Sequence, residues 1–234
     1  MIVRRTSDGL LLIAQAEHAR QAGAMARALR EAPEPRRRFE RATEIHDDGW
    51  IEADADPLLS PEGVPVSFRE YPAEPYAALW ERGIAQAIRE SRYVGLLVSL
   101  HGSRFFRSQP AVQARLRARE DALLRELGLA GSHDAPPPDV LVHHRWIDYL
   151  DRVSLMCCGD LPTPQRAEIA GVAYSAIVVG ETIVVEPWPF GAPFDAPLRG
   201  LVVESSTRSA AEDPRAVLRR GRVANVTARL RPAP

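Results

Sequence analysis

The sequence predicts an α+β fold in which a mainly helical core is followed by an antiparallel β-sheet. Between about residues 15 and 157, apolar side chains recur at intervals of three and four, the spacing of one helix face. From about residue 168 the pattern changes to short β-branched runs between turn signals, which is typical of strands. We therefore expect a single domain over 1–234, with a helical part over 1–160 and a β-rich part over 161–234.

Composition and charge exclude several classes of partner. The chain has 234 residues, of which 45% are hydrophobic and 26% charged, as in ordinary soluble globular proteins. The formal net charge of −1 provides no overall field for nucleic acid or an anionic membrane, so neither is an expected partner. All 30 basic residues are arginine. The chain therefore offers guanidinium groups for phosphate or carboxylate, but no lysine for a Schiff base or general base.

The two cysteines, Cys157 and Cys158, are adjacent in the chain. This excludes a disulfide framework and indicates reduced thiols, which we expect to act as small buried apolar side chains rather than metal ligands. The first residues lack a signal-peptide core, and the apolar run Gly9–Ala14 is too short to span a bilayer. The expected localisation is cytoplasmic.

Local patterns define the expected elements. Asp8-Gly9 is a strong hairpin signal, and Gly49 is expected to end the second helix. The apolar run within 93–106 fits either a helix or a buried strand, and we favour a helix. Residues 51–73 hold four prolines, which indicates a functional flap or a poorly ordered excursion. The expected elements are an N-terminal hairpin over 1–14 that joins the sheet, helices over 15–31, 37–48, 74–91, 93–106, 110–127 and 139–157, and strands over 170–179, 182–185, 201–204 and 223–230.

The His46-Asp47 dipeptide is the most informative local feature. Each of His18, His46 and Asp151 falls on the inward stripe of its own expected helix, whereas Asp47 lies about 100° round from His46. Imidazole and carboxylate ligands suit a divalent transition metal such as Mn, Fe, Zn or Co, which lowers the pKa of bound water. The alternative is that His18 is a hydrogen-bonded core histidine and that His46-Asp47 caps a turn.

Three further side chains are candidates for catalysis. His101 precedes Gly102-Ser103-Arg104, which would bring backbone N–H groups and the Arg104 guanidinium near a phosphate. His144 shares a helix face with Asp151 and could act as general acid, hold a second metal or stabilise a leaving oxygen, as could His101. We expect the neighbouring His143 to be exposed to solvent.

Asp48, Trp50 and Asp148 are candidates for supporting the ligands. Asp48 and Trp50 could orient a ligand histidine, or they could be a helix-end residue and a core residue. Asp148 lies in the same stripe as Asp151, and an acidic side chain on an apolar face is costly to bury unless it is paired or bound to metal.

Four segments resemble an uncharacterised bacterial family, a domain of unknown function with a His-Asp-Asp-Gly-Trp motif: Gln15–Ala19, Glu44–Trp50, Leu97–Gly102, and Asp151–Leu155 with Cys158. More distantly, the pattern is similar to the HD-domain metal-dependent phosphohydrolases. That resemblance implies an HD-like helical core with His18, His46, Asp47 and Asp151 as metal ligands. Asp151-Arg152-Val153-Ser154 is similar to the Asp-x-Leu-Ser found around the late Asp of those proteins. The loop after Trp50 and the strand-rich C-terminus depart from it.

These features predict a metal-dependent hydrolase of phosphoesters, nucleotides among them, whose partner is a small phosphorylated substrate. His101 or Arg104 would stabilise charge on the phosphoryl oxygens. The alternatives are a non-catalytic protein that binds or senses a small molecule, a metal-free structural domain, and hydrolysis by a Ser99 or Ser103 nucleophile beside His101. No Gly-x-Ser-x-Gly turn supports the last of these.

Overall fold

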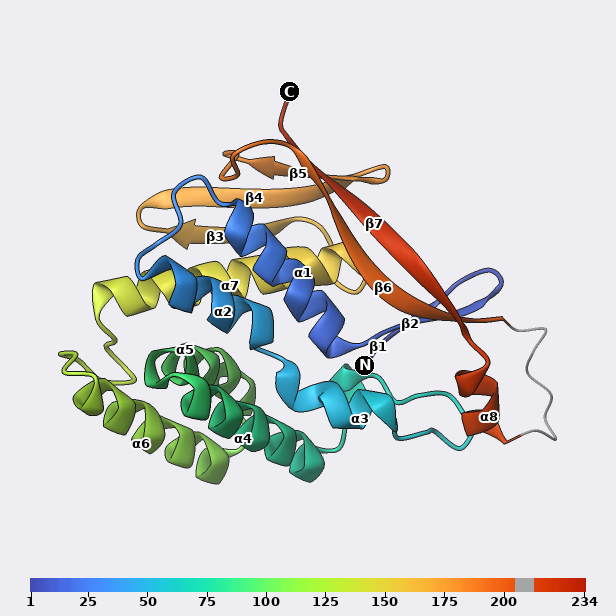
Figure 1. The fold of residues 1–234 in the computed structure, drawn as a ribbon, viewed down its shortest axis with the longest axis horizontal. Helices are drawn as coiled ribbons and strands as arrows, with labels where there is room; N and C mark the ends of the chain where they lie inside the picture. The colour runs from blue at the N-terminus through green and yellow to red at the C-terminus, as the bar shows by residue number, and fades with distance from the viewer. Residues whose placement is uncertain (205–212) are drawn as a thin grey trace.

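A twisted sheet and two layers of helices make up the computed structural model, which describes residues 1–204 and 213–234 (Figure 1). The α+β prediction is therefore confirmed. Helices α1, α2 and α7 pack together, with α1 and α7 also against the sheet, and α4, α5 and α6 lie beyond them. The helices are α1 (Gln15–Ala28), α2 (Arg36–Ile45), α3 (Ile51–Ala55), α4 (Ala73–Glu90), α5 (Arg92–Ser103), α6 (Pro110–Glu126), α7 (Pro138–Cys157) and α8 (Pro214–Arg219).

The strands of the described chain form one sheet in the order β1-β2-β6-β7-β5-β4-β3. The N-terminal hairpin joins it as expected, because β2 pairs with β6. The prediction of a purely antiparallel sheet is wrong for one pair, β5 and β7, which are parallel because β7 inserts between β5 and β6. The strands are β1 (Ile2–Arg5), β2 (Gly9–Ile13), β3 (Gln165–Ile169), β4 (Val172–Val179), β5 (Thr182–Glu186), β6 (Phe194–Glu204) and β7 (Arg222–Pro232).

Two strand boundaries differ from the sequence prediction. The expected strand 170–179 starts with a turn, in which Ala170 and Gly171 have positive φ angles of 50° and 80°, and β3 precedes it. Strand β6 begins at Phe194 rather than at 201, despite Pro197. The register of β6 with β2 covers 201–204 only, so Pro197 lies where β6 pairs with β7 alone. A proline, which has no N–H to donate, is tolerated in a strand at such an open edge.

The second helix is shorter than predicted. It ends at Ile45 rather than near 48, and a 3₁₀ turn η1 (Asp48–Trp50) follows. Gly49 therefore does not end the helix. A Cβ at Gly49 would lie 2.4 Å from the carbonyl oxygen of Leu79, so glycine lets η1 press against the backbone of α4. The predicted helices over 74–91, 93–106, 110–127 and 139–157 correspond to α4, α5 with the 3₁₀ turn η3 (Arg104–Phe106), α6 and α7.

Residues 51–73 are more ordered than an irregular loop. They contain α3, a bridge between Leu59 and Pro65, and a second 3₁₀ turn η2 (Phe68–Glu70). The prediction of a poorly ordered excursion is therefore wrong, and η2 supplies two side chains to the cavity described below. Among the helices that the structure describes, none combines the length and the apolarity needed to cross a bilayer.

Candidate metal centre

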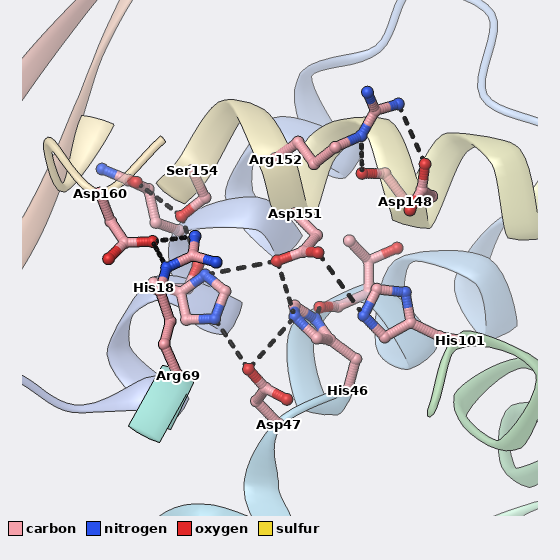
Figure 2. Close-up of polar contacts among 12 residues, drawn as sticks. His18, His46, Asp47, Arg69, His101, Asp148, Asp151, Arg152, Ser154 and Asp160 are labelled. Carbon is pink, nitrogen blue, oxygen red and sulfur yellow. Dashed lines mark hydrogen bonds and ion pairs between the residues drawn. The ribbon is translucent and has the colours of Figure 1, made fainter. Parts of the chain in front are cut away.

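Five buried side chains from four helical segments meet between α1, α2, α5 and α7 (Figure 2). His18 projects from α1, and Asp151 comes from α7. His46 and Asp47 follow the end of α2, and His101 comes from the last turn of α5. We call these five residues the His/Asp cluster. All are at most 7% exposed. The structure thus brings together the four predicted metal ligands and one predicted catalytic residue.

The end of α2 decides how His46 and Asp47 can face the same point. His46 is the C-cap residue, with φ −56° and ψ −26°, whereas Asp47 leaves the helix with φ −112° and ψ 16°. Because Asp47 has left the helix, its side chain is not turned 100° from that of His46, as it would be for neighbours within one helix. Their side chains converge, and His46 Nε2 lies 3.7 Å from Asp47 Oδ2.

Contacts within the cluster show which atoms are engaged. His18 Nε2 and Asp47 Oδ2 form a hydrogen bond of 2.8 Å. His46 Nδ1 donates to the carbonyl oxygen of Thr43 at 2.7 Å, which leaves the lone pair of Nε2 facing the carboxylates. His46 Nε2 is 3.6 Å from Asp151 Oδ1, and His101 Nε2 is 3.6 Å from Asp151 Oδ2. These longer separations exceed normal hydrogen-bond distances.

Three imidazole nitrogens of the cluster are buried without a hydrogen-bond partner among the described residues: His18 Nδ1, His46 Nε2 and His101 Nδ1. Buried polar atoms are nearly always hydrogen-bonded, so three in one place call for a ligand. Two ligands of a tetrahedral zinc ion lie roughly 3.4 Å apart, close to the 3.6–3.7 Å separations above. The cluster could therefore hold a metal ion.

Two overlapping ligand sets exist within the cluster. One comprises His18, His46 and Asp47, and the other comprises His46, His101 and Asp151. In each set the ligand atoms lie within 4.8 Å of one another. Both sets use His46, whose single free nitrogen can bind only one ion. The geometry therefore fits one ion better than two.

Burial and neighbouring charges shift the pKa values of three side chains of the cluster. Burial lowers the pKa of His46, but the Asp47 and Asp151 carboxylates outweigh it and raise that pKa to about 9. Burial raises the pKa of Asp151, but the nearby His46 imidazole and the Arg104 guanidinium favour its charged form and bring that pKa well below the ordinary value. Burial and the cations Arg104 and His46 lower the pKa of His101, which keeps that imidazole neutral.

Arg104 and Asp148 lie behind Asp151. Arg104 donates to Asp151 Oδ2 at 2.7 Å, whereas Asp151 Oδ1 faces His46. Asp148 pairs with Arg104 and, at 3.0 Å, with Arg152. Asp148 thus orients two guanidinium groups rather than a ligand histidine. It supports the site through Arg104, which is the residue in contact with Asp151.

Two of the remaining predicted residues, Asp48 and Trp50, lie beside the cluster. Burial raises the pKa of the Asp48 carboxyl, and the charges of Arg20 and Arg41 oppose that shift. Trp50 is 2% exposed and packs edge-to-face on Tyr71, with ring centroids 4.9 Å apart. Trp50 is therefore a core residue, as the alternative reading held, that also lines the cavity described below.

The two adjacent histidines of α7 have separate surroundings. The expectation that His143 is exposed is wrong: it is fully buried, and its Nδ1 is hydrogen-bonded to the Tyr93 hydroxyl at 2.9 Å. His144 shares a hydrogen bond with the backbone of Leu100, and burial lowers its pKa to about 4. His144 belongs to neither ligand set and is absent from the lining of the cavity.

The serines proposed as nucleophiles are engaged elsewhere. Ser99 Oγ donates to Glu120 Oε1 at 2.6 Å, and Ser103 Oγ donates to the Leu100 carbonyl oxygen at 3.1 Å. Among the described contacts, neither is paired with His101. This arrangement does not favour nucleophilic hydrolysis by serine.

A cavity of about 210 Å³ opens beside the cluster, with His18, Asp47, His101 and Asp151 on its lining. Sequence reasoning missed most of its other side chains. Tyr76 and Trp80 lie four residues apart on α4, a spacing that ordinary core side chains share, whereas Arg69 lies in the segment 51–73 and gives no local signal. The other lining residues are Gln15, Trp50, Phe68, Arg69, Tyr76, Trp80, Arg104, Phe105, Arg152, Leu155, Leu161 and Gln165.

Comparison with known proteins identifies the family. Residues 1–205 match the model of the family described as "Protein of unknown function (DUF3891)", and the chain belongs to that family. No curated protein and no solved structure matches the chain. The match covers the helical part with its His/Asp cluster and most of the sheet up to β6.

Proposed function

We propose that the protein is a metal-dependent hydrolase of phosphoesters, with one divalent transition metal held by His18, His46, Asp47 and Asp151. The observation that carries this proposal is the buried His46 Nε2, which has no hydrogen-bond partner among the described residues and lies 3.7 and 3.6 Å from the Asp47 and Asp151 carboxylates. The unpartnered His18 Nδ1 lies 3.9 Å from Asp151. Two imidazoles and two carboxylates suit Mn, Fe, Zn or Co. Such a metal supplies a Lewis acid and a water of lowered pKa.

The chain's own residues would orient and stabilise the substrate. Arg104 holds one oxygen of Asp151, which leaves the other free for the ion, and its Nε–H, buried without a partner among the described residues, remains for an anion. The neutral His101 beside it can donate or accept a proton at the cavity lining. His144, which burial disfavours from carrying a charge, does not line the cavity and would not contact the substrate. Nucleotides are among the phosphoesters to be tested.

The experiment is metal analysis followed by an assay on reconstituted protein. We expect about one metal ion per chain, turnover of a phosphoester, and a loss of at least roughly 10²-fold in kcat/KM in Asp47→Ala. Asp195→Ala is the matched control, because this exposed carboxylate on β6 pairs only with Arg231 in the described contacts. If Asp47→Ala equals the wild type, or no phosphoester is turned over, the hydrolase proposal is wrong.

A second candidate is a non-catalytic protein that binds or senses a small anionic molecule. The observation that favours it is the engagement of Arg104 by both Asp148 and Asp151, which leaves little of its charge for a transition state. Tight binding of a small anion by metal-loaded protein without turnover would support this candidate. Elemental analysis without metal, with a melting temperature unchanged by chelator, would instead indicate a structural domain.

A further inference from the structure

The cavity beside the His/Asp cluster is lined by two chemically different groups of side chains, aromatic rings and arginines. Figure 2 shows the cluster beside which it opens. One wall is aromatic: Trp50, Tyr76, Trp80 and Phe105 come from η1, α4 and η3. These rings brace one another, with centroid separations of 5.6 Å for Trp50–Tyr76 and 5.3 Å for Trp80–Phe105. The wall is therefore a preformed surface for a flat apolar group.

Three arginines of the same lining carry positive charge that is held in place, and the guanidinium of one of them, Arg104, lies 4.5 Å from the centroid of the Phe105 ring. Arg152 is fixed by Asp148 and by Gln165, whose oxygen lies 3.3 Å from its guanidinium. Arg69 is held by Asp160 and lies over the ring of Phe68, 4.9 Å from its centroid. Together with Arg104 they line a cavity whose ligand must offer negative charge as well as an apolar face.

Volume limits the size of that ligand. Drug-sized pockets usually measure about 300–1,000 Å³, whereas this cavity measures about 210 Å³. An apolar cavity of about 150 Å³ holds one benzene molecule. The remainder, roughly 60 Å³, accommodates about two water-sized groups, close to a phosphoryl group. A base, a sugar and a phosphate together would exceed this volume and extend out of the cavity.

We propose that the ligand of this cavity is a small aryl phosphate: one aromatic ring against the Trp80–Phe105 wall and a single phosphoryl group toward Arg104 and the cluster. This inference rests on the proposed function for the role of the cluster, and it narrows the substrate class from phosphoesters in general to monoesters with one ring. The chemistry it requires is a flat apolar body joined directly to a compact anion.

The test measures binding with phosphonates, whose carbon–phosphorus bond is not hydrolysed, so affinity is read without turnover. We expect metal-loaded protein to bind phenylphosphonate at least tenfold more tightly than methylphosphonate by calorimetry, and more tightly than adenosine monophosphate. Phe105→Ala should weaken phenylphosphonate binding roughly three- to tenfold, the value of one aromatic contact, and leave methylphosphonate unchanged.

Phe105 is 39% exposed, so its replacement should not unfold the protein. Phe105→Tyr keeps the ring and should bind like the wild type. Leu58→Ala, which removes a side chain of similar exposure away from the cavity, is the control. Equal affinity for the two phosphonates, tighter binding of the nucleotide, or an unchanged phenylphosphonate affinity in Phe105→Ala would overturn the inference.

The two proposals fail in distinguishable ways. Selective phenylphosphonate binding without hydrolysis of phenyl phosphate would remove the hydrolase and keep the ligand class. Metal-dependent hydrolysis of nucleotides without phenylphosphonate binding would keep the hydrolase and remove the ligand class.

Discussion

Two buried polar clusters each include one residue of α5, Ser99 in one and His101 in the other. They differ in how many of their polar atoms have a hydrogen-bond partner. One is the His/Asp cluster, which uses His101. The other, which we call the Glu120 cluster, comprises Ser99, Glu120 and His133. In the Glu120 cluster, Ser99 donates to one carboxylate oxygen and His133 contacts the other. In the His/Asp cluster, three imidazole nitrogens remain without partners in the described chain.

This comparison shows that a buried charged side chain does not by itself indicate a functional site. Glu120 is fully buried, yet each of its carboxylate oxygens has a partner, so it needs no ligand. It attaches His133, which lies between α6 and α7, to α6. The His/Asp cluster is similarly buried, but three of its imidazole nitrogens have no hydrogen-bond partner among the described residues, and a cation would provide one.

Glu120→Ala should have the largest effect on stability. It leaves Ser99 and His133 without their partner, and leaving buried polar groups unsatisfied costs about 1–3 kcal/mol each. Urea denaturation of wild type and variant measures the loss in unfolding free energy. Glu120→Gln keeps an acceptor for Ser99 and should lose less, while the metal content of both variants stays at the wild-type level. A Glu120→Ala protein as stable as the wild type would contradict the structural role.

Metal addition should stabilise the protein through the His/Asp cluster. At a free metal concentration about 100 times Kd, the gain is about 2.7 kcal/mol, a rise of roughly 5–10 °C in melting temperature. Differential scanning calorimetry with and without chelator measures it. The double variant His18→Ala/Asp47→Ala should show no such rise, whereas Glu120→Gln should keep it. An equal rise in the double variant would place the ion elsewhere.

A smaller effect is the pH dependence of the Glu120 cluster. The hydrogen bond to Glu120, only partly offset by burial, raises the pKa of His133 above its ordinary value. Its contribution to stability is therefore complete below about pH 6.5, and it is lost as pH rises through the raised pKa. Denaturation of wild type and His133→Gln across pH 6–9 should show a difference in stability that shrinks with rising pH. A difference that grows with pH would mean that the pKa of His133 is lowered.

Local patterns were sufficient to place the main helices and to predict that three of the candidate ligands face inward. The stripes that contain His18, His46 and Asp151 correctly placed all three inside, because a helix repeats every 3.6 residues whatever it packs against. The end of α2 was not predictable in this way. The sequence predicts that Gly49 ends the helix. In the structure, Gly49 instead lets η1 lie close to the backbone of α4 at Leu79, a residue 30 positions away.

The fold class, the hairpin and the main helices could be predicted from the sequence, since they follow from turn signals and from periodicities of neighbouring residues. Packing in three dimensions accounts for the parallel pairing of β7 with β5, for the hydrogen bond between His143 and Tyr93, and for the position of Arg69 of η2 on the cavity lining. It also separated the satisfied Glu120 cluster from the unsatisfied His/Asp cluster. Hydrogen-bond partners far apart in the chain are chosen by packing, which no local pattern records.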